Sequence, residues 1–307
     1  MSQIDPALPP FLALLAQAPP MEAIPLAEAR ARMKAVLDPF APQDVAARNL
    51  TLDGAEGPLA ARLYTPPGAP QVGPGIVFFH GGGFMVGDLE THDGACRRLA
   101  KASGLRFLSV DYRLAPEHRL PAAHDDAEAA VKWVFAHAED IGFDRTAIGV
   151  SGDSAGGNLA AWTAYVLRND PNHRLKAQIL LYPATTMQLV TESRLTLSEG
   201  YFLTQSLMSY FAEGLLGETG DPTNIRCNLL HAEDVTGVAP AHITTAGFDP
   251  LKDEGRLYAE KLSAAGVAVS HVCYEGMIHG FYNFGFLSQS LAKAIDETGH
   301  RMGEMLR

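Results

Sequence analysis

One pentapeptide constrains the fold of this chain more than any other stretch: residues 152–156 read Gly-Asp-Ser-Ala-Gly. The pattern Gly-x-Ser-x-Gly is typical of a sharp turn from a strand into a helix, which holds a serine hydroxyl clear of both elements. By itself it is short enough to be a glycine-rich turn with a solvent-facing serine. The flanking residues favour the strand-to-helix turn, because residues 147–151 form a short apolar run typical of a strand and residues 158–168 carry apolar residues at helical spacing.

The rest of the chain alternates strand-like and helix-like segments, which is typical of a parallel sheet with helical crossovers. A hairpin is expected at one sheet edge, formed by residues 49–53 and 59–64. Further strands are predicted at 75–79, 106–110, 147–151, 177–182, 242–246 and 267–273. Helices are predicted at 27–37 (stopping at Asp38-Pro39), 94–103, 122–138, 158–168 and 250–265. The sequence therefore predicts an α/β fold with a mostly parallel central sheet flanked by helices.

Two segments stand outside this alternation. Residues 1–45 are rich in proline and helical in character. Residues from about 185 to about 235 make too long an interval for an ordinary connection and carry apolar residues at helical spacing. We expect the two segments to form a helical cap over the main domain, residues 46–307. The alternative is an extra helical layer with only a packing role.

Charge and cysteine content narrow the possible partners. The net charge is −11 and no basic run occurs, which argues against nucleic acid and strongly anionic substrates. Cys96, Cys227 and Cys273 have no C-x-x-C spacing, so free thiols in a reducing compartment are expected. The histidines form neither H-E-x-x-H nor a His/Cys cluster, so no metal site is predicted. Residues 11–18 look like a signal-peptide core, but no Lys or Arg precedes them and the acidic Asp5 does, so a secretory signal is not expected. No apolar run is long enough to span a membrane. A cytoplasmic protein is expected.

Polar residues follow several predicted strands at the edge of the sheet where parallel sheets bind ligands. His80 begins a His-Gly-Gly-Gly-Phe loop, the type that supplies backbone N–H groups to an oxyanion hole. Ser154, Asp249 and His279 each follow a later strand. Serine, acid and histidine in this order are typical of α/β-hydrolases and differ from the order in other well-known serine hydrolase folds.

Each of these elements also has an ordinary interpretation. Asp249-Pro250 could cap a helix, His279 could be a packed core histidine, and the glycine loop could be a plain loop. Their joint occurrence after successive strands, in the required order, favours a catalytic site. Asp253 and Glu254 are the rival acids, but Asp249 lies at a strand end from which a loop can reach His279.

Other polar residues near the predicted site are assigned structural roles. Asp153 is expected to point away from the serine, as a structural or pocket-lining residue, and His80 to bond locally within the glycine loop. His92, His118 and His124 have no partner in the pattern and are interpreted as ordinary histidines.

The chain resembles the bacterial hormone-sensitive-lipase-like (group IV) esterases of the α/β-hydrolase fold. The resemblance covers the chain from about residue 49 to its end. It rests on the motifs His80-Gly81-Gly82-Gly83-Phe84, Asp111-Tyr112-Arg113-Leu114-Ala115-Pro116-Glu117, Gly152-Asp153-Ser154-Ala155-Gly156-Gly157-Asn158-Leu159-Ala160, Asp249-Pro250-Leu251 and His279-Gly280-Phe281. It implies that Gly82, Gly83 and Ala155 donate the N–H groups of the oxyanion hole. It also implies a cap built from the two outlying segments, short to medium acyl chains in the substrate, and a homodimer formed through a sheet edge.

The residues predict a serine carboxylesterase with the triad Ser154, Asp249 and His279, acting on small, uncharged esters through an acyl-enzyme and without a cofactor. The predicted substrate pocket is lined by apolar residues of the cap and the strand ends: Phe84, Phe202, Leu203, Leu207, Met208, Phe211 and Ile278. Two alternatives stay open. An amidase or acyltransferase would use the same triad, and a non-catalytic binding module on this fold would lack a triad member.

Overall fold

A single mixed sheet forms the centre of the molecule in the computed structural model, which describes residues 3–35, 38 and 40–307. The strand order within these residues is β1-β2-β4-β3-β5-β6-β7-β8. The strands are β1 (Ala46–Asp53), β2 (Pro58–Thr65), β3 (Gly73–Phe79), β4 (Arg106–Val110), β5 (Phe143–Asp153), β6 (Ala177–Leu181), β7 (Ala241–Phe248) and β8 (Val269–Ile278). The β1–β2 and β2–β4 pairs are antiparallel, and every other pair is parallel. This is the mostly parallel sheet with an edge hairpin that the sequence predicts.

Most strands are longer than the runs that predict them, and β5 and β8 show the reason. β5 begins at Phe143, and residues 144–146 at its start are polar and partly or fully exposed. β8 continues to Ile278, and much of it is only partly buried because it is the last strand of the sheet. A pattern based on continuous burial finds only the central part of such strands.

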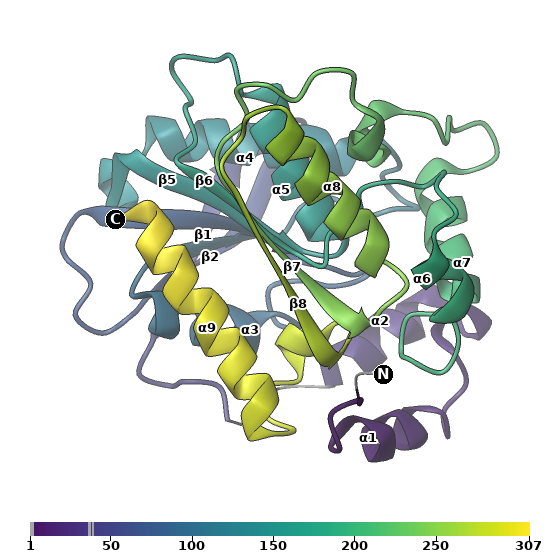
Figure 1. The fold of residues 1–307 in the computed structure, drawn as a ribbon. Coiled ribbons are helices and arrows are strands. Elements are labelled where there is room, and N and C mark those ends of the chain that lie inside the picture. The colour runs from purple at the N-terminus through teal and green to yellow at the C-terminus, as the bar shows by residue number, and fades with distance from the viewer. Residues whose placement is uncertain (1–2, 36–37, 39) are drawn as a thin grey trace.

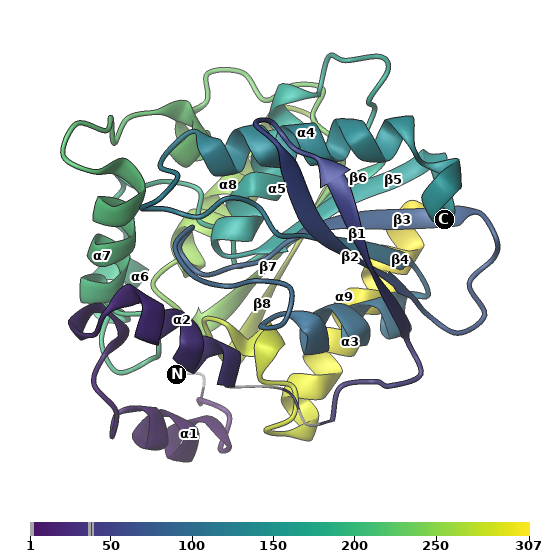
Figure 2. The same ribbon diagram turned by 180° about the vertical axis from the view of Figure 1, so that it is seen from behind.

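Helices cover both faces of the sheet (Figures 1 and 2). The helices of the described residues are α1 (Leu8–Leu15), α2 (Leu26–Ala35), α3 (Asp93–Ser103), α4 (Ala122–Ala136), α5 (Ala155–Val166), α6 (Glu192–Thr196), α7 (Gln205–Leu216), α8 (Lys252–Ala264) and α9 (Gln289–Leu306). Short 3-10 turns lie at Met21–Ala23, Glu139–Ile141, Ile225–Cys227, Leu229–His231 and Phe281–Asn283. One hydrophobic core lies between the sheet and α4, α5 and α8, and a second lies under α3 and α9. Burial on both faces explains why the central strands are almost entirely apolar.

The C-terminal helix α9 is missing from the sequence-based prediction. It packs along α3, where Gly299 and Gly303 lie against Ala102 and Ser103. Glycines inside a helix lower its intrinsic propensity, but here they allow two helices to approach closely. The tertiary contact therefore stabilises a helix that local preference alone would disfavour.

The helices of the two outlying segments lie beyond the carboxyl ends of the parallel strands (Figure 1). α6 and α7 stand beside α2, with α1 below them (Figures 1 and 2). Arg30 of α2 donates hydrogen bonds to the carbonyl oxygens of Met85 (2.9 Å) and Ala115 (3.1 Å) and forms an ion pair with Glu117. The predicted helix end at Leu37 and its stop at Pro39 lie outside the described residues.

The thiols of Cys96, Cys227 and Cys273 are all free, as the sequence predicts. Among the helices described, none has both the length and the apolar character that a bilayer span requires.

Candidate active site

The site begins at Ser154, which links β5 directly to α5. Its backbone has φ +55° and ψ −116°, a region that non-glycine residues rarely adopt and that is found mainly at functional sites. The turn is held by a hydrogen bond from Ser154 N–H to the Leu181 carbonyl oxygen at 2.9 Å. A side chain at Gly156 would collide with the carbonyl of Phe79, so only glycine allows α5 to start this close to β3.

Strand register brings the other two predicted residues to the same place. Phe248 of β7 pairs with Ile278 of β8, so Asp249 and His279 leave the sheet side by side. His279 Nδ1 lies 2.8 Å from Asp249 Oδ2, and His279 Nε2 lies 2.9 Å from Ser154 Oγ.

This chain of contacts sets the tautomer of His279. Asp249 is fully buried, and its second oxygen accepts a hydrogen bond from Leu251 N–H at 2.8 Å. The Asp249 carboxylate therefore accepts a hydrogen bond from His279 Nδ1–H. Nε2 is then left without a proton and can accept a hydrogen bond from the Ser154 hydroxyl.

The rival acids have other partners. Asp253 accepts a hydrogen bond from the backbone N–H of Ser193 at 2.8 Å. Glu254 is fully buried, pairs with Arg194 at 2.7 Å and accepts from Thr185 N–H at 2.7 Å. Burial raises the pKa of Glu254 even though Arg194 opposes the shift. Both acids thus hold residues 185–194 against α8.

The glycine loop after β3 lies beside the serine turn, because Phe79 of β3 pairs with Gly152 of β5. Gly82 and Gly83 have φ of +117° and +59°, and a side chain on Gly83 would collide with the ring of Phe211 on α7. Ala155 is the first residue of α5, so the helix offers no acceptor for its N–H group. Such an unpaired N–H at a helix start can bind an anionic oxygen.

Asp153 connects the serine turn to the glycine loop. Its Oδ1 accepts a hydrogen bond from Gly81 N–H at 2.7 Å and lies 3.3 Å from His92 Nε2. Burial alone would raise the pKa of Asp153, but His92 and the Gly81 N–H outweigh it and hold the pKa below its usual value. The prediction that His92 has no partner is therefore wrong.

His80 has the local role expected of it. Its Nδ1–H donates to the Gly81 carbonyl oxygen at 2.8 Å, and its ring stacks on Tyr112 with centroids 4.3 Å apart. The Tyr112 hydroxyl donates to the His80 carbonyl oxygen at 2.7 Å. Burial lowers the pKa of His80 to about 4, so the ring is neutral near pH 7. His124 also has a partner that the sequence did not reveal, since its Nε2 lies 2.9 Å from Asn158 Oδ1.

Known proteins share this fold and this site region. A family model described as the alpha/beta hydrolase fold matches residues 76–283, which include the glycine loop and all three residues of the Ser-His-Asp cluster. The chain belongs to the α/β-hydrolase family.

Individual relatives of this hydrolase cover most of its length. "Carboxylic ester hydrolase LipN" of Mycobacterium tuberculosis is 40% identical over 87% of this chain and 73% of its own. An ester hydrolase from the metagenome of Lake Arreo is 37% identical, with a TM-score of 0.94 over 98% of this chain and 99% of its own. A thermostable esterase from Pseudomonas putida is 32% identical, with a TM-score of 0.94 over 99% of this chain and 98% of its own. These comparisons confirm the resemblance to hormone-sensitive-lipase-like esterases.

Tyr182 is a residue of the site that sequence reasoning missed. It follows β6 with φ +36°, is fully buried, and its ring centroid lies 4.6 Å from that of His279. Its position just past a strand end is the same signal that points to the other site residues of the hydrolase. An aromatic residue between two apolar segments is, however, indistinguishable from core in the sequence.

Five of the predicted pocket residues lie in and just before α7. Phe211 covers Gly83, while Phe202, 39% exposed, lies beside Gly280 and packs its ring against Phe284. Leu203 is buried, and Leu207 and Met208 are half-buried.

Phe84 and Ile278 belong to the interior of the hydrolase. Phe84 is buried and stacks on His124 at a centroid distance of 5.5 Å, and Ile278 is fully buried in the core under α3 and α9. Within the described residues, no group of His, Cys, Asp or Glu is arranged to hold a metal ion.

Proposed function

We propose that this hydrolase is a serine carboxylesterase with Ser154 as nucleophile, His279 as general base and Asp249 as the residue that orients the histidine. The observation that carries the proposal is the unbroken hydrogen-bond chain from Ser154 Oγ through His279 to the buried Asp249. The ester hydrolases and esterases among its relatives support the choice of esters.

The reaction starts with attack of Ser154 Oγ on the ester carbonyl carbon, while the hydroxyl proton moves to His279 Nε2. Asp249 stabilises the resulting imidazolium without taking its proton. The carbonyl oxygen becomes an oxyanion, which accepts hydrogen bonds from the N–H groups of Gly82, Gly83 and Ala155. These donors are preorganised by the glycine backbone and by the start of α5.

The tetrahedral intermediate then collapses, and His279 donates its proton to the leaving alcohol. A water molecule attacks the acyl-enzyme in the same way, with His279 taking its proton. Collapse of the second intermediate returns the proton to Ser154 Oγ and releases the carboxylic acid. Each step uses only groups of the chain, substrate and water, so the mechanism requires no cofactor.

The cap segments, residues 1–45 and 185–235, enclose the substrate over the main domain, residues 46–307. Phe211 lies on the oxyanion loop at Gly83, and Phe202 lies beside Gly280, next to the catalytic histidine. Two aromatic rings so close to the reacting atoms limit the space for an acyl chain and disfavour charged groups. The substrates are therefore small, uncharged esters with short to medium acyl chains, with Leu203, Leu207 and Met208 completing the apolar wall.

Two further parts of the proposal concern the state of the protein. Three free cysteines support a reducing, cytoplasmic location. Strand β8 pairs within the described residues only with β7, and its open edge supports a homodimer formed there. Sedimentation of the purified protein tests the dimer, and a monomer mass would reject it.

The test of the proposed function is turnover of p-nitrophenyl acetate, butyrate, octanoate and palmitate by the wild type and by Ser154→Ala. Wild type should prefer the shorter chains, and Ser154→Ala should lose activity by a factor on the order of 10⁶. Activity that survives in the variant would reject Ser154 as the nucleophile. A wild type that is inactive on all four esters but cleaves amides, or transfers acyl groups to acceptors other than water, would replace the esterase with an amidase or acyltransferase.

A further inference from the structure

A hollow lies at the end of the sheet opposite the triad. It has a volume of about 770 Å³ and is lined by the end of α4, the starts of β5, β7 and β8, the segment before β6, and α9. The triad follows the carboxyl ends of β5, β7 and β8, whereas this hollow adjoins their amino ends. A ligand bound there would not touch the reacting atoms.

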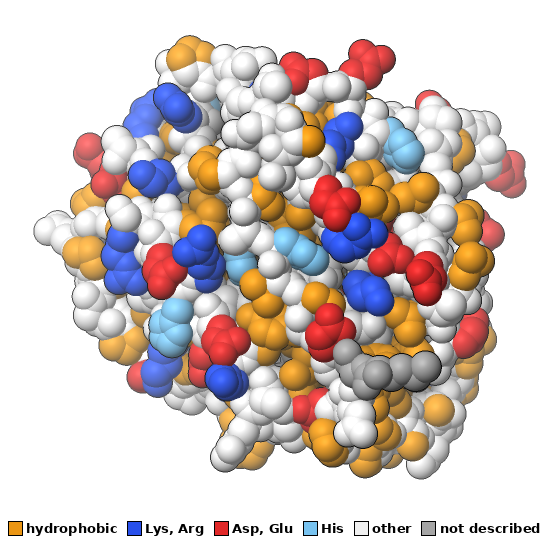
Figure 3. Space-filling view, viewed as in Figure 1, with side chains coloured by type: hydrophobic (Ala, Val, Ile, Leu, Met, Phe, Trp, Pro, Cys, Tyr) orange, Lys and Arg blue, Asp and Glu red, His pale blue; other side chains and the backbone are white. Residues whose placement is uncertain are grey.

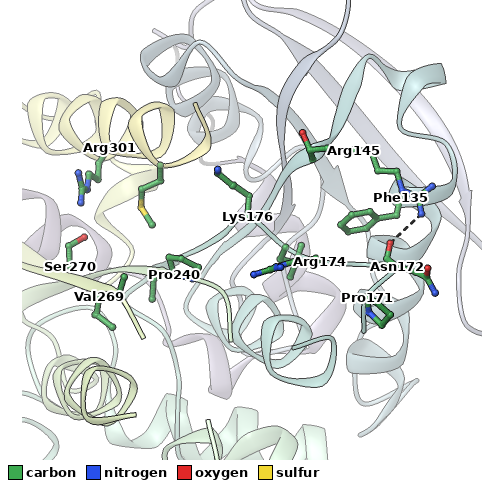
Figure 4. A pocket seen from close by; sticks show the side chains of 15 residues that line it. Phe135, Arg145, Pro171, Asn172, Arg174, Lys176, Pro240, Val269, Ser270 and Arg301 are labelled. Atoms are coloured by element: carbon green, nitrogen blue, oxygen red, sulfur yellow. Dashed lines mark hydrogen bonds between the residues drawn. The ribbon is translucent and has the colours of Figure 1, made fainter. Parts of the chain in front are cut away.

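Positive charge is concentrated in this hollow. Arg145, Arg174, Lys176 and Arg301 line it, and none of the other described residues in its lining is Asp or Glu. Figure 4 shows Arg301 towards one end, Lys176 and Arg174 between, and Arg145 towards the other end. Figure 3 shows Lys and Arg side chains on this side of the molecule, with Asp and Glu side chains among them outside the lining of the hollow. In a chain with net charge −11, such a one-signed cluster raises the local concentration of anions.

These cations are poorly compensated by the protein itself. The side chains of Arg174 and Lys176 form no hydrogen bond or ion pair with any residue the structure describes, although the backbone N–H of Lys176 donates to the Ile148 carbonyl oxygen. Arg145 donates to the Asn172 carbonyl oxygen at 3.2 Å, and Arg301 pairs with Glu304 at 2.9 Å on the exposed face of α9. An exposed pair of this kind contributes little to stability, so the guanidinium groups remain available to a ligand.

The floor of the hollow is apolar. Phe135 and Leu175 are buried beneath it, and Val269 and Met305 are partly exposed in its wall, next to Pro240. An inorganic anion would pair with the Arg and Lys side chains but would leave the apolar floor exposed to solvent. A ligand with both an apolar body and negative groups satisfies both parts of the lining.

We propose that this hollow binds an elongated organic anion that carries more than one negative charge on an apolar body. The spread of the cations along the hollow requires the charges to be separated, and the apolar floor requires a hydrophobic segment between them. Binding is independent of the ester-cleaving site, because the two sites lie at opposite ends of the strands.

Three probes separate the two requirements in isothermal titration calorimetry with the full-length wild type. Decanedioate has two carboxylates on an alkyl spine, 1,10-decanediol has the spine without charge, and tripolyphosphate has charge without the spine. Decanedioate should bind, more weakly as ionic strength rises, while the other two should bind at least about tenfold more weakly. Equal binding of the diol would overturn the role of the cations, and equal binding of tripolyphosphate would overturn the role of the apolar floor.

Charge reversal locates the site. The double variant Arg174→Glu/Lys176→Glu should weaken decanedioate binding at least about tenfold, whereas Lys293→Glu on the solvent side of α9 should change it by less than about twofold. The milder double variant Arg174→Gln/Lys176→Gln should give an intermediate loss of decanedioate affinity. It replaces the charge-reversal variant if charge reversal disturbs folding. Turnover of p-nitrophenyl butyrate should be unchanged in all three variants. Absence of decanedioate binding to the wild type, or equal binding by the wild type and the Gln double variant, would overturn the proposal.

Discussion

Asp153 Oδ1 accepts a hydrogen bond from the backbone N–H of Gly81 at 2.7 Å, across 72 residues of sequence. Asp153 immediately precedes Ser154, and Gly81 immediately precedes the two glycines whose N–H groups face the oxyanion in the proposed mechanism. One buried carboxylate thereby holds the serine turn and the glycine loop in place relative to each other. Its charge is retained in the interior because His92 lies 3.3 Å away.

Asp153→Asn should therefore lower kcat by about ten- to a hundredfold while KM changes by less than about twofold. The amide oxygen can still accept from Gly81, but without the charge the loop is held less tightly. The loss is smaller than for deletion of an oxyanion donor because the donors remain. Steady-state kinetics on p-nitrophenyl butyrate measure both constants, with the exposed Asp234→Asn as control. A raised KM at normal kcat would show that Asp153 affects substrate binding instead.

Asp249→Asn should reduce kcat by about 10⁴, because the amide disfavours the His279 tautomer that accepts the serine proton. Asp253→Asn, in the next turn of the chain, should retain activity within a few fold of wild type because Asp253 contacts Ser193 instead. The comparison uses turnover of the same ester at saturating concentration. The opposite ranking of the two variants would assign the acid to Asp253.

Phe211→Ala should shift the acyl preference towards longer chains. Removing the ring from its place against Gly83 enlarges the space beside the oxyanion loop, and we expect the octanoate-to-acetate ratio of kcat/KM to rise about tenfold. Leu207→Ala tests the neighbouring position on α7 in the same assay. Leu195→Ala is the matched control, since that side chain is 74% exposed. An unchanged ratio in Phe211→Ala would remove this residue from the acyl site, as an identical profile would remove Leu207.

Acid should destabilise the fold between about pH 6.5 and pH 4. Burial lowers the pKa values of His80, His124 and His242 to about 4, below the ordinary value of 6.5 that they regain on unfolding. Between these pH values the unfolded chain binds more protons than the folded chain, so the free energy of unfolding falls as the pH falls. Above about pH 6.5 these histidines are neutral in both states and do not affect the free energy of unfolding. Each histidine contributes up to about 1.4 kcal/mol per pH unit.

Urea unfolding of the wild type and His124→Gln across this pH window checks the prediction. The variant should show a shallower pH dependence than the wild type, because one of the three buried histidines is gone. Parallel curves for the two proteins would show that His124 does not titrate with the predicted shift.

The sequence by itself predicted the order of strands and helices, the mostly parallel sheet and the Ser-Asp-His order after strand ends. These features are written in local patterns, such as apolar runs, glycine turns and polar residues at fixed places. The same patterns missed α9, whose glycines are favourable only because they pack against α3. They favoured Asp249 over Asp253 as the triad acid only because Asp249 lies at a strand end.

Tertiary structure alone decided which distant groups meet. The pairing of Phe248 with Ile278 sets Asp249 beside His279. Packing of the interior places His92 within 3.3 Å of Asp153. The cations of the hollow come from the start of β5, the segment before β6 and α9, so no local pattern marks them. The physical reason is the same for the Asp249–His279 pair, the His92–Asp153 contact and the cations of the hollow. Hydrogen bonds, ion pairs and desolvation depend on distances in space, which strand register and helix packing set. A sequence pattern records only spacing along the chain.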